Sequence, residues 1–134
     1  MNEKEIVLDD YAFLVSETDE KGNILFANSH FCKIAEYEIE ELIGKPHSII
    51  RHPDMPKIAF KSLWDTIKKD NIWTGYVKNT TKSGGYYWVF ATVYPFLASD
   101  GSNSYLSCRR KASIEEIQKA EELYKIWKEE EENK

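Results

Sequence analysis

Three strand-like segments separated by two tight turns constrain the fold of this chain more than any other feature. Residues 72–81, 86–97 and 104–111 are rich in β-branched and aromatic side chains, which are typical of strands. The intervening residues 82–85 and 99–103 carry the Gly, Ser, Asp and Asn residues that tight turns favour. Strands joined by such short turns pair antiparallel, so this part of the chain predicts a three-stranded meander.

A second pair of strands precedes the meander. Residues 13–28 predict a β-hairpin, because two apolar segments flank a turn that contains Gly22 and Asn23. Asn28 then stands at the N-cap position of a short helix, and residues 55–69 show the apolar spacing of a longer helix. Two strands in front and three behind can form one five-stranded antiparallel sheet with the helices on one face. The predicted fold class is therefore α+β.

The last part of the chain predicts a helix that opens with a capping box of Ser113 and Glu116. Its apolar residues are spaced by three, four and three positions, which suits either a short dimer interface or packing against the domain. The spacing leaves both interpretations open. We expect the Glu run at 129–132 to be frayed and solvated.

The length of 134 residues fits a single domain. We expect an N-terminal segment at 1–10, the domain at 11–112, and a C-terminal helix with an acidic tail at 113–134. No stretch reaches the roughly 18 apolar residues of a membrane helix, and no secretory leader opens the chain, so the expected location is cytoplasmic. Cys32 and Cys108 have no metal-ligand spacing around them and predict free thiols.

Charge and motif content argue against several classes of function. The chain has 18 basic and 23 acidic residues, a net charge of −5, whereas nucleic-acid binders usually show a basic excess. The sequence contains no Walker A, Rossmann, HExxH, CxxC or GxSxG motif, and no nucleophile–base pair stands out. We therefore predict neither nucleic-acid binding nor an enzyme. The aromatic content of 13% suits either a small core or the cavity of a flat ligand.

The densest unusual stretch is the loop at residues 51–56, Arg-His-Pro-Asp-Met-Pro. Its two prolines restrict the backbone, so the loop can hold polar side chains in fixed positions. Arg51 offers a fork for phosphate or carboxylate, and His52 can stack or donate. Two other interpretations stay open: Asp54 can cap the helix that follows, and His52 can be a structural residue.

A second cluster lies on the predicted strands. Asn79 offers one acceptor and two donors, which suit the mixed edge of a heterocycle. Trp73 and Tyr87 can bound a flat ligand beside it, although aromatic residues on strands usually pack the core. Strand alternation places Tyr87 and Trp88 on opposite faces. We interpret Phe60, on the predicted longer helix, as a packing residue.

Together these motifs resemble the flavin-binding PAS domain of bacterial aerotaxis (energy-taxis) receptors, over residues 11–124. The resemblance rests on Phe26-Ala27-Asn28-Ser29-His30-Phe31, Leu42-Ile43-Gly44-Lys45-Pro46-His47, Arg51-His52-Pro53-Asp54-Met55-Pro56, Trp73-Thr74-Gly75, Val77-Lys78-Asn79 and Tyr87-Trp88-Val89. It implies the PAS fold, a five-stranded antiparallel sheet with short helices on one face and a C-terminal helix. It also implies FAD held non-covalently between the sheet and the helical segments.

The resemblance also implies which residues form the flavin site. They are Arg51, His52, Asp54, Trp73, Asn79 and Tyr87, with Asn28 and Trp64 at positions near it. By the same resemblance, the domain signals redox or energy state to a chemotaxis receptor or another signalling module, in the same chain or in a separate one. Residues 49–55 contain no cysteine, unlike the adduct-forming helix of light-sensing flavin domains, so photoadduct chemistry is not expected.

Two alternatives remain open. The domain can bind haem or another small molecule, in which case His30, His47 and His52 are the only imidazole ligands. It can also be a cofactor-free PAS module that forms a homodimer through its sheet or terminal helix. The residues alone do not distinguish FAD from FMN.

Overall fold

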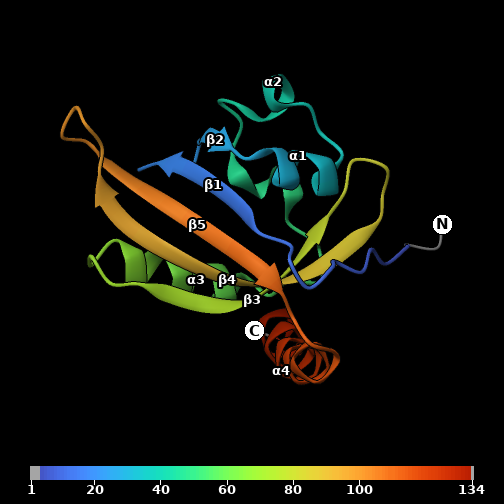
Figure 1. Ribbon diagram of the computed structural model, residues 1–134. Coiled ribbons are helices and arrows are strands. Elements are labelled where there is room, and N and C mark those ends of the chain that lie inside the picture. The colour runs from blue at the N-terminus through green and yellow to red at the C-terminus, as the bar shows by residue number, and fades with distance from the viewer. Residues whose placement is uncertain (1–3, 134) are drawn as a thin grey trace.

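The predicted meander and hairpin both form, and they combine into one antiparallel sheet (Figure 1). The computed structural model describes residues 4–133. Strand β5 pairs with both β4 and β1, so the strand order is β2-β1-β5-β4-β3 and the predicted five-stranded sheet is confirmed. The strands are β1 (Leu14–Asp19), β2 (Ile24–Ala27), β3 (Trp73–Thr80), β4 (Tyr86–Leu97) and β5 (Asn103–Lys111).

Helical segments connect the hairpin to the meander and follow the last strand. They are α1 (Ser29–Ala35), α2 (Ile39–Leu42), the 3-10 turn η1 (His47–Ile50), α3 (Lys57–Ile67) and α4 (Ile114–Glu132). Asn28 caps α1 as predicted, because its Oδ1 accepts the Phe31 N–H at 3.0 Å. The same side chain donates to the Phe13 carbonyl at 2.9 Å. Asn28 therefore ties the start of α1 to the start of β1.

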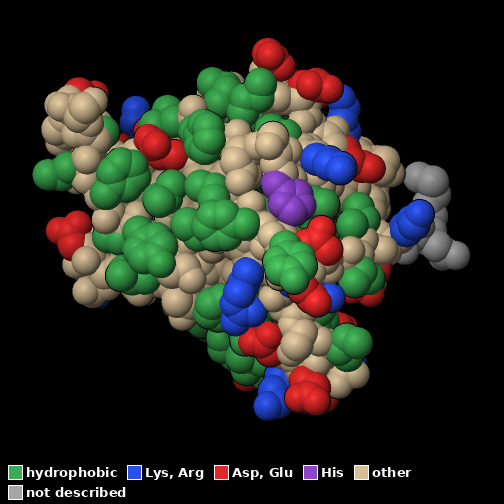
Figure 2. Space-filling model, viewed as in Figure 1, with side chains coloured by type: hydrophobic (Ala, Val, Ile, Leu, Met, Phe, Trp, Pro, Cys, Tyr) green, Lys and Arg blue, Asp and Glu red, His purple; other side chains and the backbone are tan. Residues whose placement is uncertain are grey.

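The two faces of the sheet have different surroundings. On the face that we call the inner face, Leu14, Val89 and Ala91 are buried on the side of the sheet packed by α1 and α3. Figure 1 shows α3 behind the strands, so the viewer looks at the opposite, outer face, where Figure 2 shows several hydrophobic side chains at the surface. Tyr94 and Phe96 of β4 are among the exposed ones. The sheet thus has a packed side and a side with exposed apolar groups.

The C-terminal helix packs back against the domain, which is one of the two interpretations that its spacing left open. Tyr124 stacks on Trp88 of β4 with ring centroids 6.2 Å apart, and its hydroxyl donates to the Tyr76 carbonyl at 2.6 Å. The predicted capping box of Ser113 and Glu116 is present. The helix is therefore fixed at its start by the cap and in its middle by aromatic packing.

The expectation that residues 129–132 fray is wrong. Helix α4 continues through this run, and the Glu131 carboxylate accepts the Lys57 N–H at 3.1 Å and the Ile58 N–H at 3.0 Å. These are the unpaired amides at the start of α3, so an acidic side chain from α4 caps α3. One turn earlier, Lys128 Nζ donates to the Pro53 carbonyl. The end of α4 thus holds the Pro-rich loop and the start of α3.

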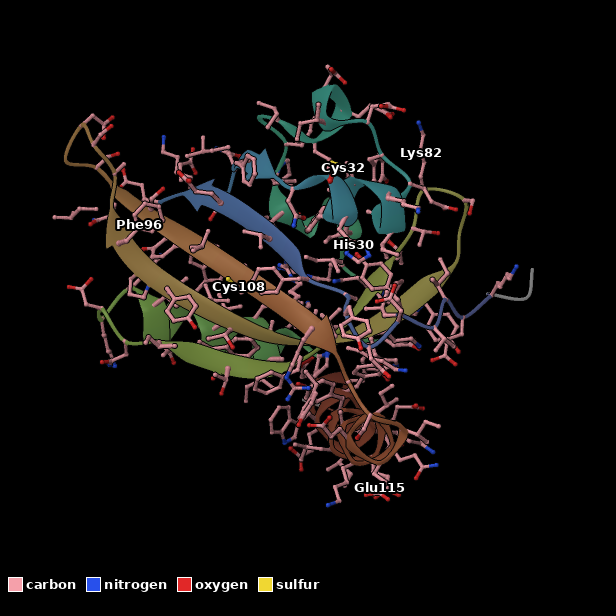
Figure 3. All side chains as sticks on the ribbon, viewed as in Figure 1. His30, Cys32, Lys82, Phe96, Cys108 and Glu115 are labelled. Carbon is pink, nitrogen blue, oxygen red and sulfur yellow. The ribbon has the colours of Figure 1, made fainter. Side chains whose placement is uncertain are left out.

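The described part of the N-terminal segment lies against the folded domain, and the two cysteines lie within it. The Ile6 N–H donates to the Tyr86 carbonyl at 2.8 Å, and Leu8 is buried, so the described part of the N-terminal segment packs on the domain. Cys32 lies on α1 and Cys108 on β5, in different layers (Figure 3), and both are free thiols as predicted.

Candidate ligand-binding cavity

A cavity of about 210 Å³ lies between helix α3, the turn η1 and the inner face of the sheet. Helix α3 contributes apolar walls, including Phe60, which packs against the core as predicted and also lines the cavity. The exposed lining residues Lys21 and Arg51 mark its opening, and the buried Asn79 and Arg109 mark its floor. Apolar walls with a few polar groups are typical of small-molecule sites. Other lining residues are Leu63, Trp64, Val77, Ala91, Val93 and Ser107.

The predicted loop and the predicted strand residue meet at this cavity. Arg51 and Asn79 form an isolated antiparallel β-bridge, and the His52 N–H donates to the Lys78 carbonyl at 3.3 Å. The loop therefore runs alongside β3 like a short extra strand. The Arg51 guanidinium lies over the Phe60 ring, 3.6 Å from the centroid, in cation–π geometry. Burial lowers the pKa of Arg51 from its ordinary value.

His52 and Asp54 lie beside the cavity and are not among its lining residues. His52 is buried, and its Nδ1 accepts the Asp54 N–H at 2.9 Å, which closes the loop on itself. The exposed Asp54 carboxylate accepts from Lys78 Nζ at 2.9 Å, and this bond lowers the pKa of Asp54. The interpretation of Asp54 as a helix cap is wrong, because α3 begins at Lys57 with Pro56 at the N-cap position.

Trp64 and Asn28, the two residues placed near the predicted site, have different positions. Trp64 forms part of the cavity wall, and its ring meets Tyr105 edge-on with centroids 5.6 Å apart. Asn28 lies outside the lining, at the start of α1. Of the predicted site residues, the structure thus brings Arg51, Asn79 and Trp64 to the cavity.

Trp73 and Tyr87 are buried on the inner face but do not line the cavity. The Trp73 ring lies against Gly75, and its Nε1 donates to Ser62 Oγ of α3 at 3.3 Å. Tyr87 pairs with Asn79 across β3 and β4, and burial raises the pKa of its hydroxyl to about 12. Both residues therefore contact elements that line the cavity but not the cavity itself.

A buried polar cluster at the floor of the cavity was missed by sequence reasoning. Arg109 Nη1 donates to Ser16 Oγ at 3.1 Å, and Nη2 donates to His47 Nε2 at 3.0 Å. Ser16 Oγ lies 3.0 Å from the same His47 nitrogen. Ser16 and His47 are 93 and 62 residues from Arg109, so no local motif joins them. The available signal was a charged residue at an inward-facing position of a strand.

Several buried polar groups around the cavity have no hydrogen-bond partner within residues 4–133. A buried group without a partner costs about 1–3 kcal/mol, and most buried groups have one. These groups come from the three strands of the meander and lie on the inner face. Their concentration beside one cavity indicates a place for a polar ligand. They are Asn79 Nδ2, the Tyr87 hydroxyl, the Ser107 hydroxyl and Arg109 Nε.

The cavity lining is cationic although the chain is acidic overall. Lys21, Arg51 and Arg109 line it, and none of its described lining residues is an Asp or a Glu. Burial lowers the pKa of Arg109 to about 10. The pKa of His47 lies well below its ordinary value because of burial and the charge of Arg109. At neutral pH the cavity therefore presents charged guanidinium groups beside a neutral imidazole.

Neither a metal-binding cluster nor a membrane-spanning helix occurs among residues 4–133. Within that range, no three His, Cys, Asp or Glu side chains are grouped to hold a metal ion, and no helix is long and apolar enough to cross a bilayer. Of the three histidines only His47 lines the cavity, and its Nε2 already faces Arg109 and Ser16. This arrangement does not favour the haem alternative.

The chain is thus a small α+β domain with an antiparallel sheet of order 2-1-5-4-3, a helical flank, and a polar-floored cavity between them. The family model described as the PAS fold matches residues 24–109, and the chain belongs to the PAS family. The light-state structure of the blue-light photoreceptor Aureochrome1 LOV has the same fold, with a TM-score of 0.71 at 18% identity, covering 80% of this chain and 87% of that one. The predicted fold is confirmed.

Curated relatives include sensory and regulatory proteins. The aerotaxis receptor of Escherichia coli (strain K12) is 44% identical over 118 residues, which cover 88% of this chain and 23% of that protein. A nitrogen fixation regulatory protein of Klebsiella oxytoca is 28% identical over 101 residues, 75% of this chain and 20% of the relative. The resemblance to aerotaxis receptors is thus confirmed. The chain spans less than a quarter of the length of these two relatives.

Proposed function

We propose that this chain is a cytoplasmic PAS sensor domain that binds FAD non-covalently and passes its redox or energy state to a chemotaxis-type signalling partner. The observation that carries the proposal is the set of unpartnered donors on the cavity floor, from Asn79, Ser107 and Arg109. The similarity to an aerotaxis receptor supports the sensory role. One fold neighbour is a Light-Oxygen-Voltage domain studied with a flavin analogue, which supports a flavin as the proposed ligand. The proposed output is signalling, not turnover.

The cavity fits the planar ring system of a flavin. Its volume of about 210 Å³ is below the roughly 300–1,000 Å³ of pockets that enclose a whole ligand, so it suits a ring system whose side chain extends outward. Phe60, Leu63 and Val77 supply apolar walls. The donors on the floor match the carbonyl oxygens and ring nitrogens at the pyrimidine edge of a flavin.

The opening of the cavity fits the phosphates of FAD. Arg51 and Lys21 are the exposed cationic lining residues, and a guanidinium can bind phosphate through two parallel hydrogen bonds. In this proposal Arg51 holds the diphosphate, while His52 and Asp54 hold the loop that carries it. Trp64 forms part of the cavity wall in this proposal. Trp73, Tyr87 and Asn28 support the elements that surround the cavity.

Asn79 is the proposed reporter of the ligand's state. A bound flavin supplies a redox centre whose charge and hydrogen-bonding pattern differ between oxidation states. Rotation of the Asn79 amide exchanges its donors for its acceptor, so this side chain can answer such a difference. Rearranging one or two hydrogen bonds is worth about 1–3 kcal/mol, the usual size of an allosteric coupling. The β-bridge between Asn79 and Arg51 connects the change to the loop.

The proposed partner is a signalling module in the same chain or in a separate one, because the matched region is 23% of the aerotaxis receptor. A second candidate function, a cofactor-free module that forms a homodimer, is favoured by the apolar groups exposed on the outer face. Tyr94 and Phe96 of β4 are each 38% exposed, and exposed apolar patches often mark interaction surfaces.

An absorbance spectrum of the purified protein tests the proposed function. We expect flavin bands near equimolar to protein, and thermal stabilisation of the apoprotein by added FAD. At a free concentration of 100 times Kd, the stabilisation should be about 2.7 kcal/mol. A Soret band would support a haem sensor instead. A colourless protein that FAD does not stabilise would overturn the flavin proposal in favour of the cofactor-free module.

A further inference from the structure

The floor of the cavity holds a buried positive charge without a counter-charge. Arg109 is 7% exposed, and within residues 4–133 no carboxylate forms an ion pair with it. Its hydrogen-bond partners are Ser16 and His47, neither of which is an anion. Removing a cation from water is costly, so buried cations usually have anionic partners. Arg109 therefore departs from the ordinary pattern at the site proposed for the ligand.

The hydrogen bonds of Arg109 fix the protons around it. A guanidinium only donates, so Ser16 Oγ and His47 Nε2 both accept from it. His47 Nε2 consequently carries no proton, and the Ser16 hydroxyl, 3.0 Å away, can only share the single lone pair of that nitrogen with Arg109. The imidazole is neutral in this arrangement. The positive charge of Arg109 thus remains uncompensated.

The other polar groups of the floor also act as donors toward the cavity. Arg109 Nε and Asn79 Nδ2 can only donate, and both lack a partner within the described chain. The Ser107 hydroxyl can donate as well, and it has no partner there. Because none of the described lining residues is acidic, the lining offers these donors no negatively charged acceptor.

We propose that Arg109 selects the charge of the ligand: the cavity takes a ligand whose buried edge is acceptor-rich and can carry negative charge. This inference rests on the proposed function and deepens it. For a flavin, it means that Arg109 favours the anionic reduced form over the neutral oxidised form. Two electrons and one proton from water convert the oxidised form to that anion, and in the test below dithionite supplies the electrons and is oxidised.

The same feature makes a prediction about the ligand-free protein. Arg109→Met removes a desolvated charge and keeps a long side chain, while Ser16 and His47 still satisfy each other. We expect the apoprotein of this variant to be at least as stable as the wild type, although its ligand binding is weaker. A residue kept only for its packing would give the opposite pattern, with lower stability and unchanged binding.

Anaerobic titrations of the apoprotein with oxidised FAD and with dithionite-reduced FAD test the inference. Arg109→Met should weaken binding of the reduced form at least tenfold more than that of the oxidised form. This ratio lowers the two-electron midpoint potential by about 30 mV. Arg109→Lys, which keeps the charge, should retain most of the preference. The matched control is Arg110→Met, since Arg110 is the next residue, on the outer face, with a side chain 54% exposed.

The outcomes separate the inference from the proposed function. If Arg109→Met binds both forms as the wild type does, or loses both equally, the charge-selecting role of Arg109 is overturned while the flavin proposal stands. The same holds if the Arg109→Met apoprotein fails to fold or is clearly less stable. A wild-type protein that binds neither form overturns both proposals together.

Discussion

Arg51 and Asn79 form a backbone β-bridge that joins the Pro-rich loop to strand β3 at the cavity. The His52 N–H reinforces it by donating to the Lys78 carbonyl at 3.3 Å. Because these contacts are made by the main chain, truncating the Arg51 side chain leaves the loop's attachment in place. The contribution of the guanidinium to ligand binding can therefore be measured separately from that of the loop.

Arg51→Ala should weaken FAD binding about tenfold to a hundredfold more than riboflavin binding. A charge-assisted hydrogen bond is worth about 1.5–3 kcal/mol, and only FAD carries the phosphates that Arg51 is proposed to hold. Fluorescence titrations of the apoprotein with both ligands measure the difference. Lys33→Ala, an exposed cation of α1 outside the lining, is the control. An equal loss for both ligands would place Arg51 at the ring system instead.

His52→Ala should lower the free energy of unfolding by about 1–3 kcal/mol and reduce the flavin content, because it removes a buried side chain that closes the loop. Asp54→Ala removes the exposed partner of Lys78, whose own side chain is only 13% exposed, and should cost about 1 kcal/mol. Urea denaturation and the absorbance ratio of flavin to protein measure the two effects. Full flavin retention in both variants would show that the loop does not contribute to the site.

Gly75→Ala should destabilise the fold by about 1–3 kcal/mol. A Cβ at this position would lie 2.5 Å from two ring atoms of Trp73, so the indole must move away from Ser62 of α3. Thermal unfolding and tryptophan fluorescence report the change. Thr74→Ala, at the exposed neighbouring position of β3, is the control and should have little effect. Wild-type stability in Gly75→Ala would contradict the close packing.

Glu131→Gln should lower the free energy of unfolding by about 1 kcal/mol, because the carboxylate accepts two backbone N–H groups at the start of α3. The adjacent Glu130→Gln makes the same change of charge one residue away and should leave stability unchanged. Chemical denaturation of the two variants measures the difference. Equal effects would mean that the net charge of the tail, not the cap, determines stability.

The contribution of Glu131 should depend on pH. The Ile58 and Lys57 N–H groups lower the pKa of Glu131 below its ordinary value of 4.5, so the folded state favours the charged form. The stabilisation is therefore complete above the unfolded pKa and is lost as the pH falls through the folded pKa. The stability difference between wild type and Glu131→Gln should accordingly shrink from pH 7 toward pH 3. A difference that is constant over this range would contradict the carboxylate cap.

Local signals predicted the elements whose determinants lie within a few residues of one another. The Asn28 cap, the Ser113–Glu116 box and the hairpin turn depend on contacts that the sequence spacing itself encodes. The meander followed from short turns between β-branched strands. These patterns suffice for the hairpin and for the meander, where short turns set each strand's neighbour, but the pairing of β1 with β5 that joins them depends on long-range contacts.

The cavity could be predicted only in part. Arg51, Asn79 and Trp64 belong to motifs that stand out in the sequence, and the fold brings them together. Arg109 and His47 meet because β5 pairs with β1, and η1 lies against the inner face of these two strands. No local spacing in the sequence encodes this relationship. Contacts between residues so far apart in the sequence are determined by the register of the sheet.

The wrong expectations have a similar cause. Asp54 has the chemistry of a helix cap, yet Glu131 from the far end of the chain takes that role. The glutamate run at 129–132 was expected to be frayed because its composition gives no sign of the contact that Glu131 makes with α3. Long-range contacts thus overrode two reasonable local interpretations.

The cap that α4 places on α3 makes two amide protons into reporters of the terminal helix. The Lys57 and Ile58 N–H groups are held by Glu131, whereas the Ala59 N–H is held within its own segment by the Pro56 carbonyl. Hydrogen exchange at the first two therefore needs only the departure of the end of α4, and exchange at the third needs α3 itself to open. Comparing the exchange rates of these amides therefore measures how often the end of α4 detaches from α3 and from the loop that carries Arg51. The measurement needs no label on the protein.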